Sequence, residues 1–289
     1  MGSECPHDVP VTSILSLPKR LVIFDLDGVV YRGDAPTPGA AEAITRLVSC
    51  GYQVRFLTNN SSRSRDSYHD KLAGMGIDAA PEQVMTSAFA TAIYLRTNGF
   101  EGRRALVVGE MGLVDELRSA GIDALPAGET FDGAPVAAVV VGIDRFFTYE
   151  RLLQAQQAIV AGAEFIATNA DPTFPTESGE IPGGGAILAG IQVSSGRQPL
   201  IIGKPNTYTL GLLLRDARIP RSEAVLVGDR LDTDISVGRQ ADLETILTLT
   251  GVTRREDAEQ APPNLRPNAI IRDLRDLEGL LTDGGRRVA

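Results

Sequence analysis

The chain contains 289 residues, of which 43% are hydrophobic and 22% are charged, so it can bury one large core or two moderate ones. A formal net charge of −9 argues against a nucleic-acid partner and against an anionic membrane surface, which leaves a small molecule as the expected partner. Two cysteines, Cys5 and Cys50, are too few for a disulfide framework or a cysteine zinc site. No segment has the pattern of an export signal or the length of a membrane span, so we expect a cytoplasmic protein.

Short apolar segments alternate with amphipathic ones, which predicts β-α units and a parallel sheet. In chain order, strands are expected at 21–25, 53–60, 104–109, 137–144, 164–168, 224–229 and 244–250. Helices are expected at 39–50, 65–76, 111–120, 148–161 and 233–241, and residues 269–281 are expected to form a strand and a closing helix. The glycine cluster at 183–185 is expected to be a turn before a helix.

The ends of the chain carry acidic loops that complement each other, so the middle section is expected to be inserted into a single core. We predict a flexible N-terminus at 1–17, a core formed by 18–84 and 201–289, and an inserted α/β unit at 85–200.

The first strand runs directly into two acidic residues. Asp25 and Asp27 stand two positions apart in "FDLDG", which places them on the same side of an extended backbone. Two carboxylates so close raise each other's pKa unless a cation or a reacting proton uses them. Gly28 follows and leaves backbone amides open to an anion. The alternative is an ordinary strand that ends in an Asx or glycine turn.

The second strand is followed by "TNNSSRS". Thr58 can donate its hydroxyl, and the amides of Asn59 and Asn60 can face an oxyanion near a helix N-terminus. Taken alone, the stretch equally fits plain helix capping.

Two later loops add a lysine and further acids. Lys204 ends the apolar run of "LIIGKP" outside any Walker A pattern, and by itself it would be an ordinary surface lysine. Asp229 ends the strand of "VLVGD", with Asp232 and Asp234 close behind, and we interpret Asp232 as the cap of the following helix. Several carboxylates gathered around one lysine are tolerable only if a hard cation such as Mg²⁺ is held by their oxygens.

Carboxylates, a divalent cation, a lysine and backbone amides together suit phosphoryl transfer, because the cation and the lysine neutralise phosphoryl oxygens while a nucleophile attacks in line. A carboxylate can be that nucleophile and form an aspartyl-phosphate. We infer that one aspartate after the first strand attacks. Its neighbour two positions on protonates the leaving alcohol and then deprotonates the water that hydrolyses the intermediate.

The motifs "DLDG", "TN", "GKP" and "GDRLDTD", in this order, resemble those of the haloacid dehalogenase superfamily over nearly the whole chain. The resemblance implies an α/β fold with a Rossmann-like, doubly wound parallel-sheet core. The implied roles are nucleophile for Asp25, general acid and base for Asp27, phosphate ligands for Thr58 and Lys204, and a Mg²⁺ site of Asp25, the backbone carbonyl of Asp27, Asp229 and Asp234, the last of which usually orients the metal's water shell.

The stretches "DGVVYRG" and "TNNSSRS", together with the long insertion, are similar to subfamily IIA of this superfamily. That subfamily contains p-nitrophenyl phosphatases, nagD-like nucleotide phosphatases, pyridoxal phosphatase, and phosphoglycolate and glycerol phosphatases. In these relatives the insertion is an α/β cap domain over the active site, and many of them are homodimers through the cap. The resemblance therefore implies a cap and a homodimer here.

The segment "ATNADPTFPTESGEIPGGG" resembles the substrate-specificity loop of the subfamily. Phe174 stands where pyridoxal phosphatases carry a histidine, which argues against pyridoxal phosphate, and "NADPTFPT" is more similar to bacterial glycerol phosphate phosphatases. We predict that Asn169, Asp171, Phe174 and Pro175 face the leaving group. The alternative is a proline-rich turn that Asp171 caps.

The expected function is hydrolysis of a small phosphate monoester with Mg²⁺, of the glycerol 3-phosphate, 2-phosphoglycolate or p-nitrophenyl phosphate type. The alternatives are a phosphatase for nucleotides or sugar phosphates and a phosphomutase. A non-enzymatic phosphate-binding regulatory module would be expected to lack at least one of Asp25, Asp27, Lys204 and Asp229, and all four are present.

Overall fold

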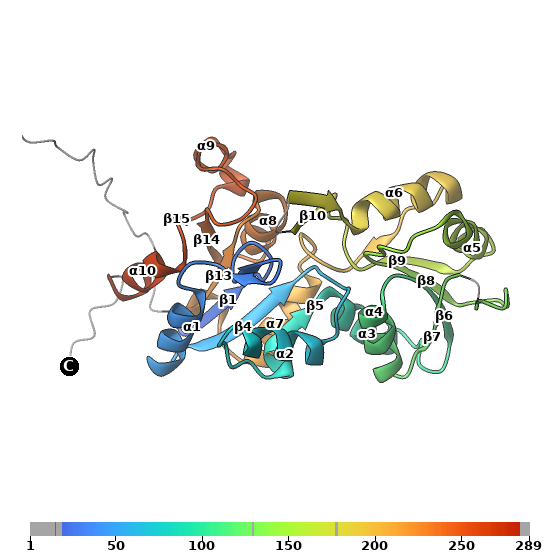
Figure 1. Ribbon diagram of the computed structural model, residues 1–289, viewed down its shortest axis with the longest axis horizontal. Helices are drawn as coiled ribbons and strands as arrows, with labels where there is room; N and C mark the ends of the chain where they lie inside the picture. Colours follow the sequence, from blue (N-terminus) through green and yellow to red (C-terminus); the bar gives the residue numbers. More distant parts are fainter. Residues whose placement is uncertain (1–14, 16–18, 129, 177–178, 284–289) are drawn as a thin grey trace, which may run out of the picture.

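Two parallel β-sheets, each with helices on both faces, organise the residues that the computed structural model describes, which are residue 15 and residues 19–128, 130–176 and 179–283 (Figure 1). The predicted flexible N-terminus at 1–17 lies outside this part of the chain, apart from Leu15. The core sheet has the strand order β15 (Ala269–Ile271), β14 (Glu244–Thr248), β13 (Ala224–Gly228), β1 (Leu21–Phe24), β4 (Gln53–Thr58) and β5 (Val84–Thr86).

Strand β1 lies in the middle of the core sheet. Its four apolar residues are all buried, as expected for a strand covered on both faces, and it pairs in parallel with β13 and β4. The chain builds the sheet outward from β1 through β4 to β5, and later from β13 through β14 to β15. The strand order therefore reverses between β1 and β13, which is where open α/β sheets bind ligands.

Helices cover both faces of the core sheet. Val22 and Phe24 pack toward α1 (Ala40–Ser49), α2 (Arg65–Gly74) and α10 (Leu277–Asp283). Leu21 and Ile23, which alternate with them, pack toward α7 (Tyr208–Ala217) and α8 (Ser236–Gln240). This arrangement confirms the predicted doubly wound, Rossmann-like α/β core. A short helix, α9 (Arg255–Glu259), follows β14.

A second sheet, here called the inserted sheet, forms between β5 and α7 in the chain and lies beside the core in Figure 1. Its strand order is β12 (Leu200–Ile201), β9 (Glu164–Ala167), β8 (Ala138–Val141), β6 (Arg104–Val108) and β7 (Asp123–Pro126). Ala105 and Val107 pack in one apolar cluster with α3 (Ser87–Thr97) and α4 (Met111–Ser119). Leu106 and Val108 pack on the opposite face with α5 (Tyr149–Val160) and α6 (Gly184–Ser195).

The two predicted boundaries of the inserted unit fall inside strands. Strand β5 pairs with β4, so Met85 and Thr86 belong to the core sheet. Strand β12 pairs with β9, so Ile201 belongs to the inserted sheet. Both boundaries are set by strand pairing between residues that are distant in sequence, and local composition does not reveal this pairing.

Two antiparallel hairpins complete the strands. One joins β2 (Tyr31–Arg32) to β3 (Ala35–Pro36), and the other joins β10 (Thr173–Thr176) to β11 (Gly179–Pro182) just before α6. A helix follows the glycine cluster at 183–185 as predicted, but the cluster is not a turn before it: Gly183 is the N-cap of α6, and Gly184 and Gly185 form its first turn. Among the described helices, none combines the length and the apolar character that crossing a membrane requires.

Candidate active site

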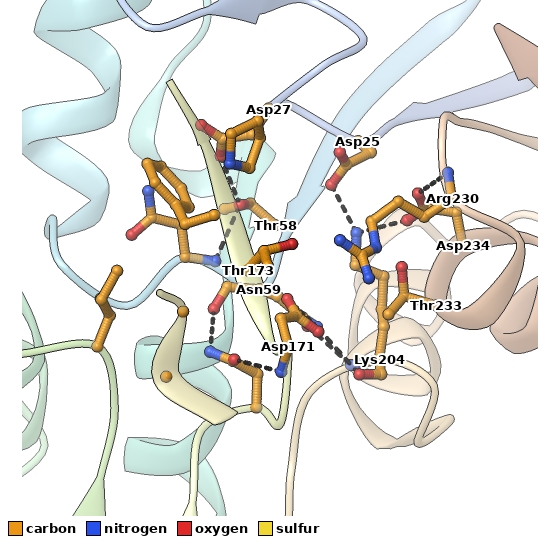
Figure 2. Close-up of a pocket in the computed structure, with 17 residues that line it drawn as sticks. Asp25, Asp27, Thr58, Asn59, Asp171, Thr173, Lys204, Arg230, Thr233 and Asp234 are labelled. Atoms are coloured by element: carbon orange, nitrogen blue, oxygen red, sulfur yellow. Dashed lines mark hydrogen bonds and ion pairs between the residues drawn. The ribbon is translucent and has the colours of Figure 1, made fainter. Parts of the chain in front are cut away.

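A pocket lies between the carboxyl ends of the core strands and the segment around the hairpin β10-β11 (Figure 2). The core contributes Asp25, Asp27, Thr58, Asn59, Asn60, Lys204, Arg230, Thr233 and Asp234. The inserted unit contributes Ile143, Asn169, Asp171, Thr173, Phe174, Pro175, Gly183 and Gly184. Segments far apart in sequence thus meet at one site, as predicted from the polar residues that end the core strands.

Lys204 forms a buried ion-pair network with two aspartates. Its Nζ donates to Asp25 Oδ1 at 2.5 Å and to Asp234 Oδ1 at 2.6 Å, and only 2% of the residue is exposed. Burial raises the pKa of Asp25 well above its usual range, although Lys204 acts in the opposite direction. For Lys204 itself, burial lowers the pKa, but Asp234 and Asp25 outweigh burial and raise it. The lysine is therefore a fixed cation in the site and not a surface residue.

Asp27 lies beside Thr58 and lacks a direct bond to the lysine. Thr58 Oγ1 donates to Asp27 Oδ2 at 3.4 Å, and the same hydroxyl oxygen accepts from the Asn60 amide at 3.1 Å. Burial raises the pKa of Asp27 to about 6, even though Lys71 and Lys204 act to lower it. A carboxyl group with this pKa can hold or release a proton near neutral pH, which suits the predicted role of general acid and base.

Asp229 supplies an oxygen that suits a metal ion. Its Oδ2 accepts from the Val252 amide at 2.7 Å, whereas its buried Oδ1 has no hydrogen-bond partner among the residues that the structure describes. Asp25, Asp229 and Asp234 each place one carboxylate oxygen within 4.8 Å of the others. Burial, with the Asp234 carboxylate next in effect, raises the pKa of Asp229 to about 7. Clustered buried oxygens, one of them without a partner, fit Mg²⁺, which prefers oxygen ligands.

The amide of Gly28 itself is used inside the first loop, and the expectation that this loop leaves other backbone amides open to an anion stays a prediction. The Gly28 amide donates to the Tyr31 carbonyl at 2.8 Å, so this N–H closes a turn and is not available to an anion. Gly28 has φ +94°, and a Cβ there would lie 2.6 Å from Asp229 Oδ2. The glycine is required because the first loop passes directly against the metal-site carboxylate.

The side-chain amide of Asn59 is used inside the protein and is not turned toward an oxyanion, whereas a contact from the backbone amide of Asn59 stays a prediction. The side-chain Oδ1 accepts from the Lys204 amide at 2.8 Å, while Nδ2 donates to the Lys204 carbonyl and to the Asp171 carboxylate, at 3.0 Å in each case (Figure 2). The backbone amide of Asn60 is likewise used internally, in the bond to Thr58. Both groups organise the loop, so any phosphate contact by these residues would use other atoms.

The four residues predicted on the inserted unit all line the pocket. Asn169 Nδ2 donates to the Asn59 carbonyl at 2.7 Å, and the Asp171 amide donates to Asn169 Oδ1 at 3.1 Å. Phe174 and Pro175 reach the pocket from β10. Burial raises the pKa of Asp171 to about 6, although its bond from Asn59 lowers it. The direction in which these side chains meet a leaving group stays a prediction.

Arg230 lines the pocket, and no role was predicted for it from the sequence. Its position within the acidic motif "GDRLDTD" is the signal that could have found it. Its Nε and one terminal nitrogen donate to Asp232 at 3.1 and 2.8 Å. The interpretation of Asp232 as a helix cap is therefore wrong, because Asp232 pairs with the arginine and lies inside a π-helical turn (Leu231–Ile235) that begins after Arg230 and continues directly into α8. Asp234 binds the local backbone instead, accepting from the amides of Asp229 and Arg230.

Comparisons with known proteins agree with this geometry. The family model described as haloacid dehalogenase-like hydrolase matches residues 22–123, and a model described as HAD-hydrolase-like matches residues 201–277. A glycerol-3-phosphate phosphatase of Gallus gallus is 37% identical, over 91% of this chain and 92% of its own. A 5'-nucleotidase of Bacillus subtilis is 39% identical, over 81% of this chain and 88% of its own.

Among solved structures, the glycerol phosphate phosphatase of Mycobacterium tuberculosis in complex with magnesium superposes with a TM-score of 0.80 at 36% identity. The match covers 92% of this chain and 78% of that one. The similarity extends over nearly the whole chain, and the two family models span the stretches that contain Asp25, Thr58, Lys204 and Asp229. The chain belongs to the haloacid dehalogenase-like hydrolases, in subfamily IIA.

Proposed function

We propose that the protein is a magnesium-dependent phosphatase that hydrolyses a small phosphate monoester, of the glycerol 3-phosphate, 2-phosphoglycolate or p-nitrophenyl phosphate type. The observation that carries the proposal is the buried lysine between two aspartates, beside a third aspartate with an unpartnered oxygen. A dianionic phosphoryl group suits this arrangement, because its oxygens can accept hydrogen bonds from Lys204 while a cation balances the negative charge of the carboxylates.

The site residues can divide the reaction into two displacements. Asp25 attacks phosphorus, the bond from phosphorus to the alcohol oxygen breaks, and Asp27 gives its proton to that oxygen. A water molecule then attacks the aspartyl-phosphate and passes a proton to Asp27, which releases inorganic phosphate and restores the Asp25 carboxylate. Asp25, Asp229 and Asp234 would hold Mg²⁺, and the positive charge of the ion would offset the negative charge on the phosphoryl oxygens.

The inserted unit serves in this proposal as the cap that meets the leaving group. It forms the pocket wall opposite the core carboxylates, with Asp171, Phe174 and Pro175 among its lining residues. The mixed polar and apolar lining suits a short polyol or hydroxy-acid group. Relatives named for glycerol 3-phosphate support this class, and the similarity to a 5'-nucleotidase makes nucleoside monophosphates the second candidate.

We also propose a homodimer through the inserted unit. Phe146 is 69% exposed and Tyr149 is 79% exposed, and Tyr149, Leu153 and Val160 follow one another along α5 at helical spacing. Large apolar side chains gathered on one unit are typical of a protein interface. Light scattering on the purified protein measures the resulting mass directly.

The test is phosphate release from a panel of monophosphates, each with Mg²⁺ and with EDTA. The panel contains glycerol 3-phosphate, 2-phosphoglycolate, nucleoside monophosphates, a sugar phosphate, pyridoxal phosphate and p-nitrophenyl phosphate. We expect metal-dependent release with a preference for a small substrate. No release by a folded, Mg²⁺-binding protein would contradict the proposal, and transfer of the phosphoryl group back to substrate would indicate a phosphomutase.

A further inference from the structure

Asp171 carries the one carboxylate that the inserted unit places in the pocket wall, among the residues described there. Both of its oxygens accept from Asn59 Nδ2 at 3.0 Å. The carboxylate is thus directed toward a core residue, and Asn59 belongs to the loop that follows β4. A contact between the inserted unit and the core therefore lies within the site itself.

The Asn59 carboxamide in turn holds the backbone of the lysine at both of its polar groups. Asn59 Oδ1 accepts from the Lys204 amide at 2.8 Å, and Nδ2 donates to the Lys204 carbonyl at 3.0 Å. One hydrogen of Nδ2 remains, and it points to Asp171. An ionised carboxylate only accepts hydrogen bonds, so Asp171 pairs with the NH₂ group of the Asn59 carboxamide. A flipped carboxamide would place its oxygen against the carboxylate and is therefore disfavoured.

The inserted unit fixes the position of Asp171 from its own side. The Asp171 carbonyl accepts from the Gly185 amide in the first turn of α6 at 2.8 Å, and its amide donates to Asn169 Oδ1 at 3.1 Å. A chain of hydrogen bonds consequently runs from α6 through Asp171 and Asn59 to Lys204. The side chain of Lys204 then binds Asp25, the proposed nucleophile.

We infer that Asp171 is a positioning residue that holds the Lys204 backbone through the Asn59 carboxamide. The segment that meets the leaving group then also sets the place of the lysine that binds the phosphoryl group. This inference rests on the proposed function. It differs from the role expected from sequence, in which Asp171 contacts only the leaving group.

The positioning role and the leaving-group role of Asp171 predict different effects on phosphoryl binding when the carboxylate is removed. Lysine has a long, flexible stem, so the position of Nζ depends on how firmly the backbone at its base is held. Without Asp171, Asn59 Nδ2 loses a charge-assisted bond, and the loop that carries Lys204 gains freedom. Phosphoryl binding then weakens for every substrate. A contact confined to the leaving group would leave phosphoryl binding unchanged.

The experiment measures calorimetric binding of orthovanadate in the presence of Mg²⁺, because this phosphate analogue has no leaving group. We expect Asp171→Ala to weaken vanadate binding about tenfold. Asp171→Asn keeps an oxygen that accepts from Asn59, so its affinity should stay within about threefold of the original protein. Glu180→Ala is the matched control, since it removes an exposed carboxylate from the hairpin that follows Asp171 in the chain, and vanadate binding should not change.

Unchanged vanadate affinity in a folded Asp171→Ala protein, with only a higher KM for monoesters, would overturn the inference. If circular dichroism shows that this variant is unfolded, Asp171→Ser takes its place, because the shorter side chain cannot reach Asn59 and the same weakening is expected. Failure of the unaltered protein to bind vanadate with Mg²⁺, or to release phosphate from any monoester, would instead overturn the proposed function.

Discussion

The core sheet and the inserted sheet share one architecture and use it differently. In each, strand order reverses once along the sheet, between β1 and β13 in the core and between β6 and β8 in the inserted sheet. In the core, the residues that follow these strands are Asp25 and Asp229. In the inserted sheet they are Gly109 and Gly142. Ligands of open parallel sheets bind at such reversal points, so the reversal points of the two sheets can be compared directly.

A loop of the core occupies the reversal point of the inserted sheet. Ser61 lies so close to Gly142 that a Cβ there would be 2.5 Å from its Oγ, and the backbone of Arg63 packs against Gly112 in α4. Glu116 of the same helix accepts from the Arg65 amide at 2.8 Å. One crevice thus holds the chemical groups and the other anchors the two units together. Changes at the core crevice should therefore affect all substrates alike, and changes in the hairpin of the inserted unit should affect them unequally.

The largest effect is expected from Asp25→Asn. An amide is nearly isosteric with the carboxylate but is a poor nucleophile, so turnover of every monoester in the panel should fall by about 10⁴-fold or more. The fold should persist, because the ionised carboxylate is already unfavourable in its buried position. Phosphate release and thermal melting measure the two outcomes. A folded variant that retained a tenth of the activity would remove Asp25 from the role of nucleophile.

The residues that meet at the core crevice could be predicted from sequence because each follows an apolar strand. Asp25 and Asp229 directly follow β1 and β13, Thr58 is the last residue of β4, and parallel strands bring their carboxyl ends to one edge. The hydrogen-bond partners of the loop residues could not be predicted. The Asn59 carboxamide binds Asp171 and Lys204, which are 112 and 145 positions away in the chain, so nothing local indicates its orientation.

A smaller and selective effect is expected from Phe174→Ala. The ring lines the pocket from β10, on the inserted unit, and lies outside the carboxylate and lysine network of the core. Its loss should change the ratio of kcat/KM between p-nitrophenyl phosphate and glycerol 3-phosphate by about tenfold, because apolar contact with the leaving group changes. Vanadate binding should be retained. An equal loss for both substrates would contradict the division of labour between the two units.

The smallest effect concerns stability and depends on the sign of a pKa shift. Burial raises the pKa of Asp229 to about 7, whereas an unfolded aspartate titrates at about 4. Between these values the folded protein binds more protons than the unfolded chain. The free energy of unfolding therefore decreases as pH rises from about 4 to about 7. Mg²⁺ binds the ionised carboxylate, so it should restore the lost free energy of unfolding, and it should do so most strongly above about pH 7, where the carboxylate is ionised.

We accordingly expect Mg²⁺ to raise the Tm by about 5 °C more at pH 8 than at pH 5.5, as measured by calorimetry. Asp229→Asn removes the titrating group and should abolish most of this difference. Glu116→Gln is the matched control from the inserted unit, where a buried acid also has a raised pKa but faces the Arg65 amide, so the response to Mg²⁺ should persist. Equal Mg²⁺ shifts at both pH values would show that the core acids are not the metal site.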